Sequence, residues 1–297
     1  MKRILSALLA ALLLLPCLGG CARPAHDGTS IAATTWPVYQ FTSAVCEGTD
    51  LTVTQVVTGQ VSCLHDYTLT VRQMQAIEDA DLVIMTGCEL EEFMADALES
   101  ANDVIECCAG IPLLGGEEHE EHEAHEGHHH EDEPDPHIWM DPDNAAIMVQ
   151  NIAAELSLRY PDYAATFEKN AAAYCQQLAD QQAYGVQTLS DLSCRELVTF
   201  HDGFAYFAQA FDLTVLAAFE EEDGAMASAR TLEEIIGLVE AHELPAIFVE
   251  AFGSDSAASV ISAQTGARVF TLSMAMSGED YITAMRHNID TVKEALG

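Results

Sequence analysis

A long helical run in the middle of the chain sets the layout of everything around it. The run starts at Pro161, where a first helical turn tolerates proline, and it contains no glycine until Gly185. At about 1.5 Å per residue such a helix spans roughly 40 Å, which is the width of a whole lobe. The sequence therefore predicts a rigid connector that joins two separately folded halves.

Both halves show the same alternation of apolar segments and helical segments. Because the apolar segments are apolar on both faces, they are typical of parallel strands covered by helices. The sequence thus predicts an α/β protein of two lobes, each with a roughly four-stranded parallel sheet flanked by helices, joined by one long connecting α-helix. The expected strands are 30–37, 51–57, 81–87 and 103–108 in the first half, and 196–202, 213–219, 246–252 and 267–272 in the second. The expected boundaries are 30–142 for the N-terminal lobe, 143–190 for the helical connector and 191–297 for the C-terminal lobe.

The N-terminus has the layout of a secretory signal. In "MKRILSALLAALLLLPCLGGC" two basic residues precede an apolar run that is too short to span a membrane. We expect a signal peptide at 1–20, lipid attached to Cys21 because the run that ends there resembles a bacterial lipobox, and a lipidated tether at 21–29. The alternative is an ordinary signal peptide followed by an incidental cysteine. The lipoprotein would be extracytoplasmic, anchored to the outer face of the cell membrane, and periplasmic in a cell that has an outer membrane.

The charge of the chain excludes one class of partner. A formal net charge of -37 leaves no basic surface for nucleic acid, and it attracts cations instead. Besides Cys17 and Cys21 the chain has seven scattered cysteines, none of them in a CxxC pair. The odd number leaves at least one unpaired, and single cysteines of this kind are usually small buried hydrophobic residues.

An acidic, histidine-rich loop at 115–135 interrupts the first half. It has no apolar periodicity, so it cannot bury a core and we expect it to be mobile. Neutral imidazoles can bind zinc, and the surrounding carboxylates raise the local cation concentration. We therefore predict that the loop collects zinc weakly, or senses its abundance, and passes ions on; the alternative is a spacer with incidental metal affinity. Its histidines are His119, His122, His125, His128, His129 and His130.

Three other histidines follow predicted strands or precede predicted helices. His65 and His137 belong to the first half and His201 to the second. Ligands of open α/β sheets bind at the carboxyl ends of strands, so these three side chains could converge in a cleft between the lobes. Three neutral imidazoles with one further ligand are the coordination that zinc prefers, whereas a single histidine is more often simply hydrogen-bonded or exposed.

The segments that carry these histidines resemble a known family. "HDYTLTVRQMQAIEDADLVIMTG", "DPHIWMDPDNA" and "FHDGFAYFAQAFDL" look like its three metal-histidine motifs, and "YITAMRHNIDTVKEAL" looks like its closing helix. The family comprises the substrate-binding lipoproteins of zinc and manganese ABC importers, cluster A-I, and the zinc-uptake members in particular. The resemblance implies two four-stranded lobes on one backbone helix, a histidine-rich loop beside the cleft, and a membrane permease with a cytoplasmic ATPase as partners. It implies a monomeric carrier and no enzyme.

The resemblance also bears on which metal is bound and on the fourth ligand. His201 stands where zinc binders carry histidine and manganese binders typically carry glutamate, which favours Zn²⁺ over Mn²⁺. Ser273 stands where many members have an aspartate ligand, and serine binds zinc poorly. The fourth position is therefore open to water, to a side chain of the acidic loop, to Cys63, or to Glu250, which could instead hold a ligand histidine in place.

Two rival functions remain from other classes. A zinc hydrolase or lyase would also hold its metal with three histidines and a water, although no HExxH or GxSxG run is present. An adhesin or metal-storage lipoprotein would make the acidic loop the functional part.

Overall fold

Two parallel sheets organise the chain, as the sequence predicts. The computed structural model describes residues 29–59, 64, 67–115, 134–219, 228–251, 253 and 255–297. The predicted signal peptide, Cys21, Cys63, His65 and the six loop histidines lie outside these residues. The first sheet has the order β2-β1-β3-β4 and the second the order β6-β5-β7-β8, and every paired strand is parallel to its neighbour.

All eight predicted strands are found, each a little shorter than expected. In the N-terminal lobe they are β1 (Ser30–Ala33), β2 (Thr52–Gln55), β3 (Leu82–Met85) and β4 (Val104–Glu106); in the C-terminal lobe they are β5 (Glu196–Thr199), β6 (Thr214–Ala218), β7 (Ala246–Glu250) and β8 (Arg268–Leu272). β1 and β7 are almost completely buried, as strands covered by helices on both faces should be.

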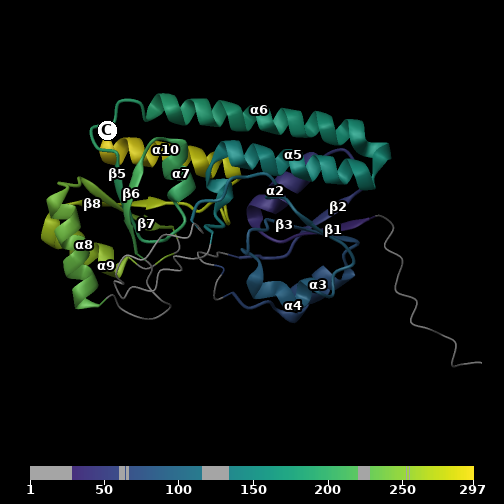
Figure 1. Ribbon diagram of the computed structural model, residues 1–297, viewed down its shortest axis with the longest axis horizontal. Helices are drawn as coiled ribbons and strands as arrows, with labels where there is room; N and C mark the ends of the chain where they lie inside the picture. The colour runs from purple at the N-terminus through teal and green to yellow at the C-terminus, as the bar shows by residue number, and fades with distance from the viewer. Residues whose placement is uncertain are drawn as a thin grey trace, which may run out of the picture.

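Helices cover both sheets and connect them (Figure 1). Those of the N-terminal lobe are α2 (Trp36–Val45), α3 (Val71–Asp79) and the short α4 (Ala95–Leu98); those of the C-terminal lobe are α7 (Ala205–Ala210), α8 (Ala229–Ala241), α9 (Ser256–Thr265) and α10 (Tyr281–Leu296). Between the lobes come α5 (Pro142–Arg159) and α6 (Ala164–Thr188). Short 3-10 turns precede α4, α5 and α6, at Glu92–Met94, Ile138–Met140 and Pro161–Tyr163.

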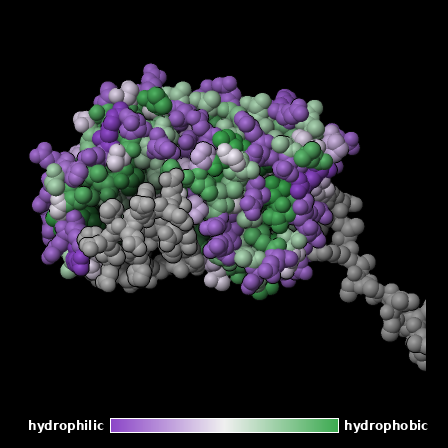
Figure 2. Space-filling view, viewed as in Figure 1, coloured by the Kyte–Doolittle hydropathy of each residue, from purple (hydrophilic) through white to green (hydrophobic). Residues whose placement is uncertain are grey.

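The connector α6 is one unbroken helix of 25 residues, which amounts to about 37 Å. Figure 1 shows it along one long side of the molecule, above α5 and α10. Its buried positions recur at helical spacing, at Phe167, Ala171, Leu178, Gln181 and Gly185. The rest of its surface is mostly polar, and Figure 2 shows many hydrophilic side chains along this edge.

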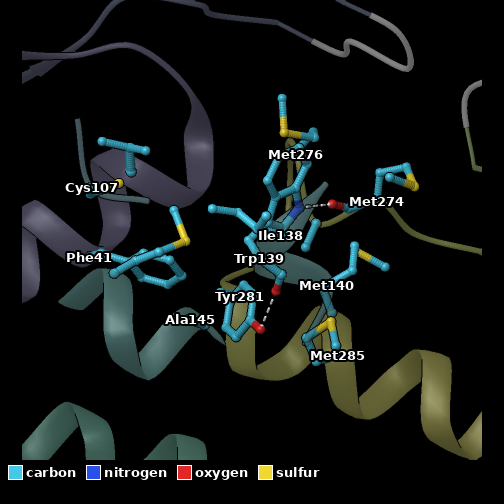
Figure 3. Close-up of a cluster of buried hydrophobic side chains, with 14 of the residues drawn as sticks. Phe41, Cys107, Ile138, Trp139, Met140, Ala145, Met274, Met276, Tyr281 and Met285 are labelled. Carbon is cyan, nitrogen blue, oxygen red and sulfur yellow. Dashed lines mark hydrogen bonds between the residues drawn. The ribbon is translucent and has the colours of Figure 1, made fainter. Parts of the chain in front are cut away.

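The lobes also meet directly through a buried layer around Trp139 (Figure 3). The indole N–H of Trp139 donates to the Met274 carbonyl at 2.8 Å, and the Tyr281 hydroxyl donates to the Trp139 carbonyl at 2.6 Å. Buried polar groups that are paired in this way fix the relative position of the elements that carry them. In the part of the chain that the structure describes, no helix has the length and apolar content needed to cross a bilayer.

Candidate metal centre

His137 and His201 come together between the lobes. His137 lies immediately before the 3-10 turn Ile138–Met140, and His201 follows β5 after one residue. Both are buried, and their ring centroids are 5.3 Å apart with the planes at 86°. Two imidazoles bound to one tetrahedral zinc through nitrogens at about 2.0–2.1 Å place their centroids about 5 Å apart. The observed spacing is thus compatible with a shared ion.

Asp135 fixes the orientation of the His137 ring. Its Oδ1 atom lies 2.8 Å from Nδ1 of His137 and also accepts a hydrogen bond from the His137 backbone N–H at 2.9 Å. Because a carboxylate oxygen accepts, Nδ1 must carry the proton, which leaves the lone pair of Nε2 available to a metal. Ligand histidines in metal sites usually have such a partner. Asp135 is not among the residues predicted from the sequence, although its position two residues before the histidine, in an Asp-Pro-His turn, is a signal for this contact.

Gly203 supplies the space in which the two rings meet. A β-carbon at this position would lie 2.9 Å from Cδ2 of His201 and 3.1 Å from Cδ2 of His137, and only 2.4 Å from Cε of Met274. Real β-carbons essentially never come within 3.0 Å of another heavy atom, so a side chain at position 203 would push the rings or the methionine away. Because residue 203 is a glycine, both histidine rings can pack against its backbone.

Tyr206 of α7 ties the base of the acidic loop to the site. Its hydroxyl accepts from the Leu114 N–H at 2.9 Å and donates to the Asp135 carbonyl at 3.1 Å. Burial, helped by the nearby Asp135 carboxylate and the thiols of Cys88 and Cys108, raises the pKa of Tyr206 to about 12, so the hydroxyl keeps its proton.

The two ends of the loop are also joined to each other. The backbone N–H of Asp135 donates to the Leu114 carbonyl at 2.8 Å, and Gly115 forms an antiparallel bridge with Pro134. The acidic segment thus leaves and re-enters the fold at one point, two residues before His137. Its six histidines lie outside the described residues.

The third predicted ligand, His65, also lies outside the described residues, and its place in the site stays a prediction. On one side of it Leu64 is buried, and its carbonyl accepts from the Tyr67 N–H at 3.0 Å. Beyond Tyr67, Thr70 begins α3 with a reciprocal cap to Gln73. Leu64, Tyr67 and Thr70 are therefore held by hydrogen bonds within the described part of the chain.

Two described residues bear on the identity of the fourth ligand, Glu250 and Ser273. Glu250 is buried at the carboxyl end of β7, and its role stays a prediction. The Ser273 hydroxyl accepts from the Ala275 N–H at 3.1 Å, while Asn288 of α10 bonds both the N–H and the carbonyl of Ser273. This serine therefore helps to hold its own turn. Across the described ranges, no three His, Cys, Asp or Glu side chains gather closely enough to hold an ion.

The chain is similar to one known protein family and to characterised members of it. The family described as zinc-uptake complex component A, periplasmic (ZnuA), matches residues 31–295. The zinc-binding lipoprotein AdcA of Streptococcus pneumoniae is 32% identical over 99% of this chain, and the chain spans 61% of the length of that relative.

Two solved structures resemble the fold closely. Zn(II)-bound AdcA from Streptococcus pneumoniae has a TM-score of 0.76 and 29% identity, covering 91% of this chain and 58% of that one. The laminin-binding protein Lbp of Streptococcus pyogenes has a TM-score of 0.75 and 26% identity, covering 92% of this chain and all of that one. The first of these is a structure with zinc bound.

Proposed function

The chain belongs to the ZnuA family of zinc-uptake components, and from that premise we propose that it captures Zn²⁺ outside the cytoplasm and delivers it to an ABC importer. In this role the chain is a binding component, which carries the ion and catalyses no reaction on it. The observation that carries the proposal is the pair of buried imidazoles, His137 and His201, 5.3 Å apart at nearly right angles.

The proposed site has three imidazole ligands, from His65, His137 and His201. Asp135 orients His137, and Gly203 leaves room for the rings. Neutral nitrogen ligands in a tetrahedral arrangement suit zinc, whereas manganese is better served by carboxylate oxygen. We therefore assign zinc as the transported ion and Mn²⁺ as a weaker competitor. Water or Glu250 would complete the coordination.

The proposed partners follow from family membership. A membrane permease driven by a cytoplasmic ATPase would receive the ion, and a lipid on Cys21 would keep the carrier at the outer face of the membrane. The acidic loop would collect ions weakly and release them near His137. This role is supported by the joined ends of the loop, which lie two residues from that histidine.

Of the rival functions, the hydrolase is disfavoured because the family is one of uptake components. The adhesin or storage role would make the acidic loop, and not the cleft, the functional part. Growth under zinc limitation after deletion of the gene separates the two, because only loss of a carrier makes growth depend on added zinc.

Isothermal titration calorimetry of the purified chain with Zn²⁺ and with Mn²⁺ tests the proposal. We expect one tight site that prefers zinc and that is lost on His201→Ala, while His287→Ala on the exposed face of α10 leaves it unchanged. Equal zinc binding by wild type and His201→Ala would refute the proposed site.

A further inference from the structure

Cys88 and Cys108 bring two thiols together away from the histidine pair. β3 and β4 run parallel with Met85 opposite Glu106, so the residues that follow the two strands emerge side by side. Cys88 and Cys108 are both half-buried free cysteines, and their thiols are close enough to shift each other's pKa in opposite directions. The sequence predicts single, buried cysteines, so two neighbouring thiols are not expected from it.

Backbone geometry holds Cys88 in this position. Gly87, Cys88 and Glu89 all have left-handed backbone angles, with φ of 85°, 55° and 67°. The left-handed region is disfavoured for residues with a β-carbon, so the turn must be held by its surroundings. A β-carbon on residue 87 would lie 2.6 Å from Sγ of Cys108, so only glycine lets the turn come this close.

The buried side chain of Glu91 holds this turn in place through hydrogen bonds. Glu91 is fully buried and accepts from the backbone N–H groups of Thr86 and Gly87 at 2.8 and 3.0 Å, and from the Thr34 hydroxyl at 2.8 Å. The turn that carries Cys88 is thereby pinned at its base. Cys88 is thus pre-positioned beside Cys108, which reduces the rearrangement needed to join the two sulfurs.

The two thiols differ in acidity. The hydrogen bond from the Cys88 thiol, together with one from the Cys88 backbone N–H, lowers the pKa of Cys108. The same hydrogen bond, and then burial, raises the pKa of Cys88. Cys107 is next in sequence, but its thiol is fully buried and donates to the Thr86 carbonyl at 3.8 Å, and burial raises its pKa well above the ordinary value. The attacking thiolate of the cluster therefore belongs to Cys108.

We propose that Cys88 and Cys108 are a redox-active dithiol, which a low-molecular-weight disulfide oxidises to an intramolecular disulfide bond. The thiolate of Cys108 attacks one sulfur of the small disulfide, forming a mixed disulfide and releasing the first small thiolate. The Cys88 thiol then gives its proton to solvent, and its sulfur attacks the Cys108 sulfur and expels the second thiolate. The protein loses two hydrogens and two electrons, and the small disulfide becomes two thiols.

The new bond would join the turn after β3 to the segment that leads from β4 to the base of the acidic loop. That segment reaches Leu114, whose N–H is bound by Tyr206. The Tyr206 hydroxyl in turn donates to the Asp135 carbonyl, so the dithiol is connected to the proposed metal site without being part of it. The oxidation itself needs no metal ion, and its test is independent of zinc binding.

Peptide mapping of the purified full-length chain tests this inference. The reduced chain is equilibrated with graded ratios of oxidised to reduced glutathione, quenched with acid and alkylated. Cleavage after glutamate is required, because trypsin would leave both cysteines in one peptide between Arg72 and Arg159. We expect a Cys88–Cys108 cross-link that grows with the proportion of oxidised glutathione. Both cysteines fully alkylated at the most oxidising ratio, or either of them linked instead to Cys63 or Cys107, would overturn the inference.

Three variants sharpen the result. In Cys88→Ser the second step is blocked, so Cys108 should accumulate the mixed disulfide with glutathione; a Cys108 thiol that stays unmodified there would contradict its role as the attacking group. Cys107→Ser should form the cross-link to the wild-type extent. So should Cys175→Ser, a control on α6 whose half-buried thiol contacts Ala146 and Gln150. Far-UV circular dichroism checks that each variant is folded, and the peptide map of the wild-type chain tests the inference even if no variant folds.

Discussion

The imidazole ring of His137 stands almost perpendicular to that of His201, and their centroids are 5.3 Å apart. The two residues are 64 positions apart in the sequence (201 − 137) and come from different lobes. Their meeting depends on the buried hydrogen bonds around Trp139 that join the lobes. The relative position of the lobes therefore determines whether the site exists.

Removing the Asp135 carboxylate should weaken zinc binding without removing the site. In Asp135→Ala the His137 ring loses the acceptor that fixes its Nδ1 proton, so we expect the Kd for zinc to rise about 10- to 100-fold. Calorimetry measures the change. Asp162→Ala, at an exposed position in the turn before α6, is the matched control and should bind as the wild type does. An unchanged Kd in Asp135→Ala would mean that the carboxylate does not orient the ligand.

A methyl group at position 203 should disturb both rings. Gly203→Ala places a β-carbon within 3.1 Å of each histidine, so we expect weaker zinc binding in a chain that still folds. Gly237→Ala in α8 is the control, because no atom lies within 4 Å of its β-carbon. This control should keep its zinc affinity and gain about 0.5–1 kcal/mol in free energy of unfolding, since alanine is the better helix former. Wild-type affinity in Gly203→Ala would show that the rings do not need this space.

Deleting residues 117–133 should remove zinc ions from the complex but leave the tight site. The ends of the segment already pair at Gly115 and Pro134, so a short turn can close the gap without moving Asp135. We expect the stoichiometry to fall to one ion and the capture of zinc from a dilute pool to slow. A full-length variant with its six histidines replaced by asparagine separates loss of ligands from loss of chain. If stoichiometry and capture are unchanged in both, the loop does not collect zinc.

The stability of the N-terminal lobe should depend on Glu91 in a pH-dependent way. Burial raises the pKa of this carboxyl in the folded chain, although its hydrogen bonds to Thr34, Thr86 and Gly87 act in the opposite direction. The folded state then holds a proton that the unfolded state has lost, so the free energy of unfolding falls as pH rises from about 4 towards the raised pKa.

Glu91→Gln removes this ionisation, so its free energy of unfolding relative to the wild type should increase over the same pH range. Urea denaturation at several pH values measures the difference. Glu92→Gln, an exposed neighbour, should follow the wild-type curve. A constant difference between Glu91→Gln and wild type at all pH values would contradict a raised pKa.

The sequence predicted the layers of the fold more fully than the site. Apolar runs mark the central strands β1, β3, β5 and β7 most clearly, because these strands are buried, whereas the edge strands β2, β6 and β8 are largely exposed or half-buried. The long run before Gly185 marks the connector. His137 and His201 could be placed at strand and helix ends, and the rule that ligands collect at such ends brought them together. The role of Asp135 was not foreseen because it depends on a turn two residues long. The contact of Gly203 with both rings depends on the docking of two lobes, which local sequence does not encode.

The contact between two of the cysteines was not predictable from the sequence either. Composition predicted small buried residues, which describes Cys46 and Cys107. The contact between Cys88 and Cys108 arises from the register of β3 on β4 and from a left-handed turn at two residues that are not glycine. Neither feature can be read from spacing alone.

A crystal structure of the zinc-loaded chain, with anomalous differences measured at the zinc absorption edge, tests the central claim most directly. We predict one dominant peak bonded at about 2.0–2.1 Å to Nε2 of His137, to a ring nitrogen of His201 and to His65. Zinc bound elsewhere, with the nitrogens of His137 and His201 too far apart to share it, would contradict the account.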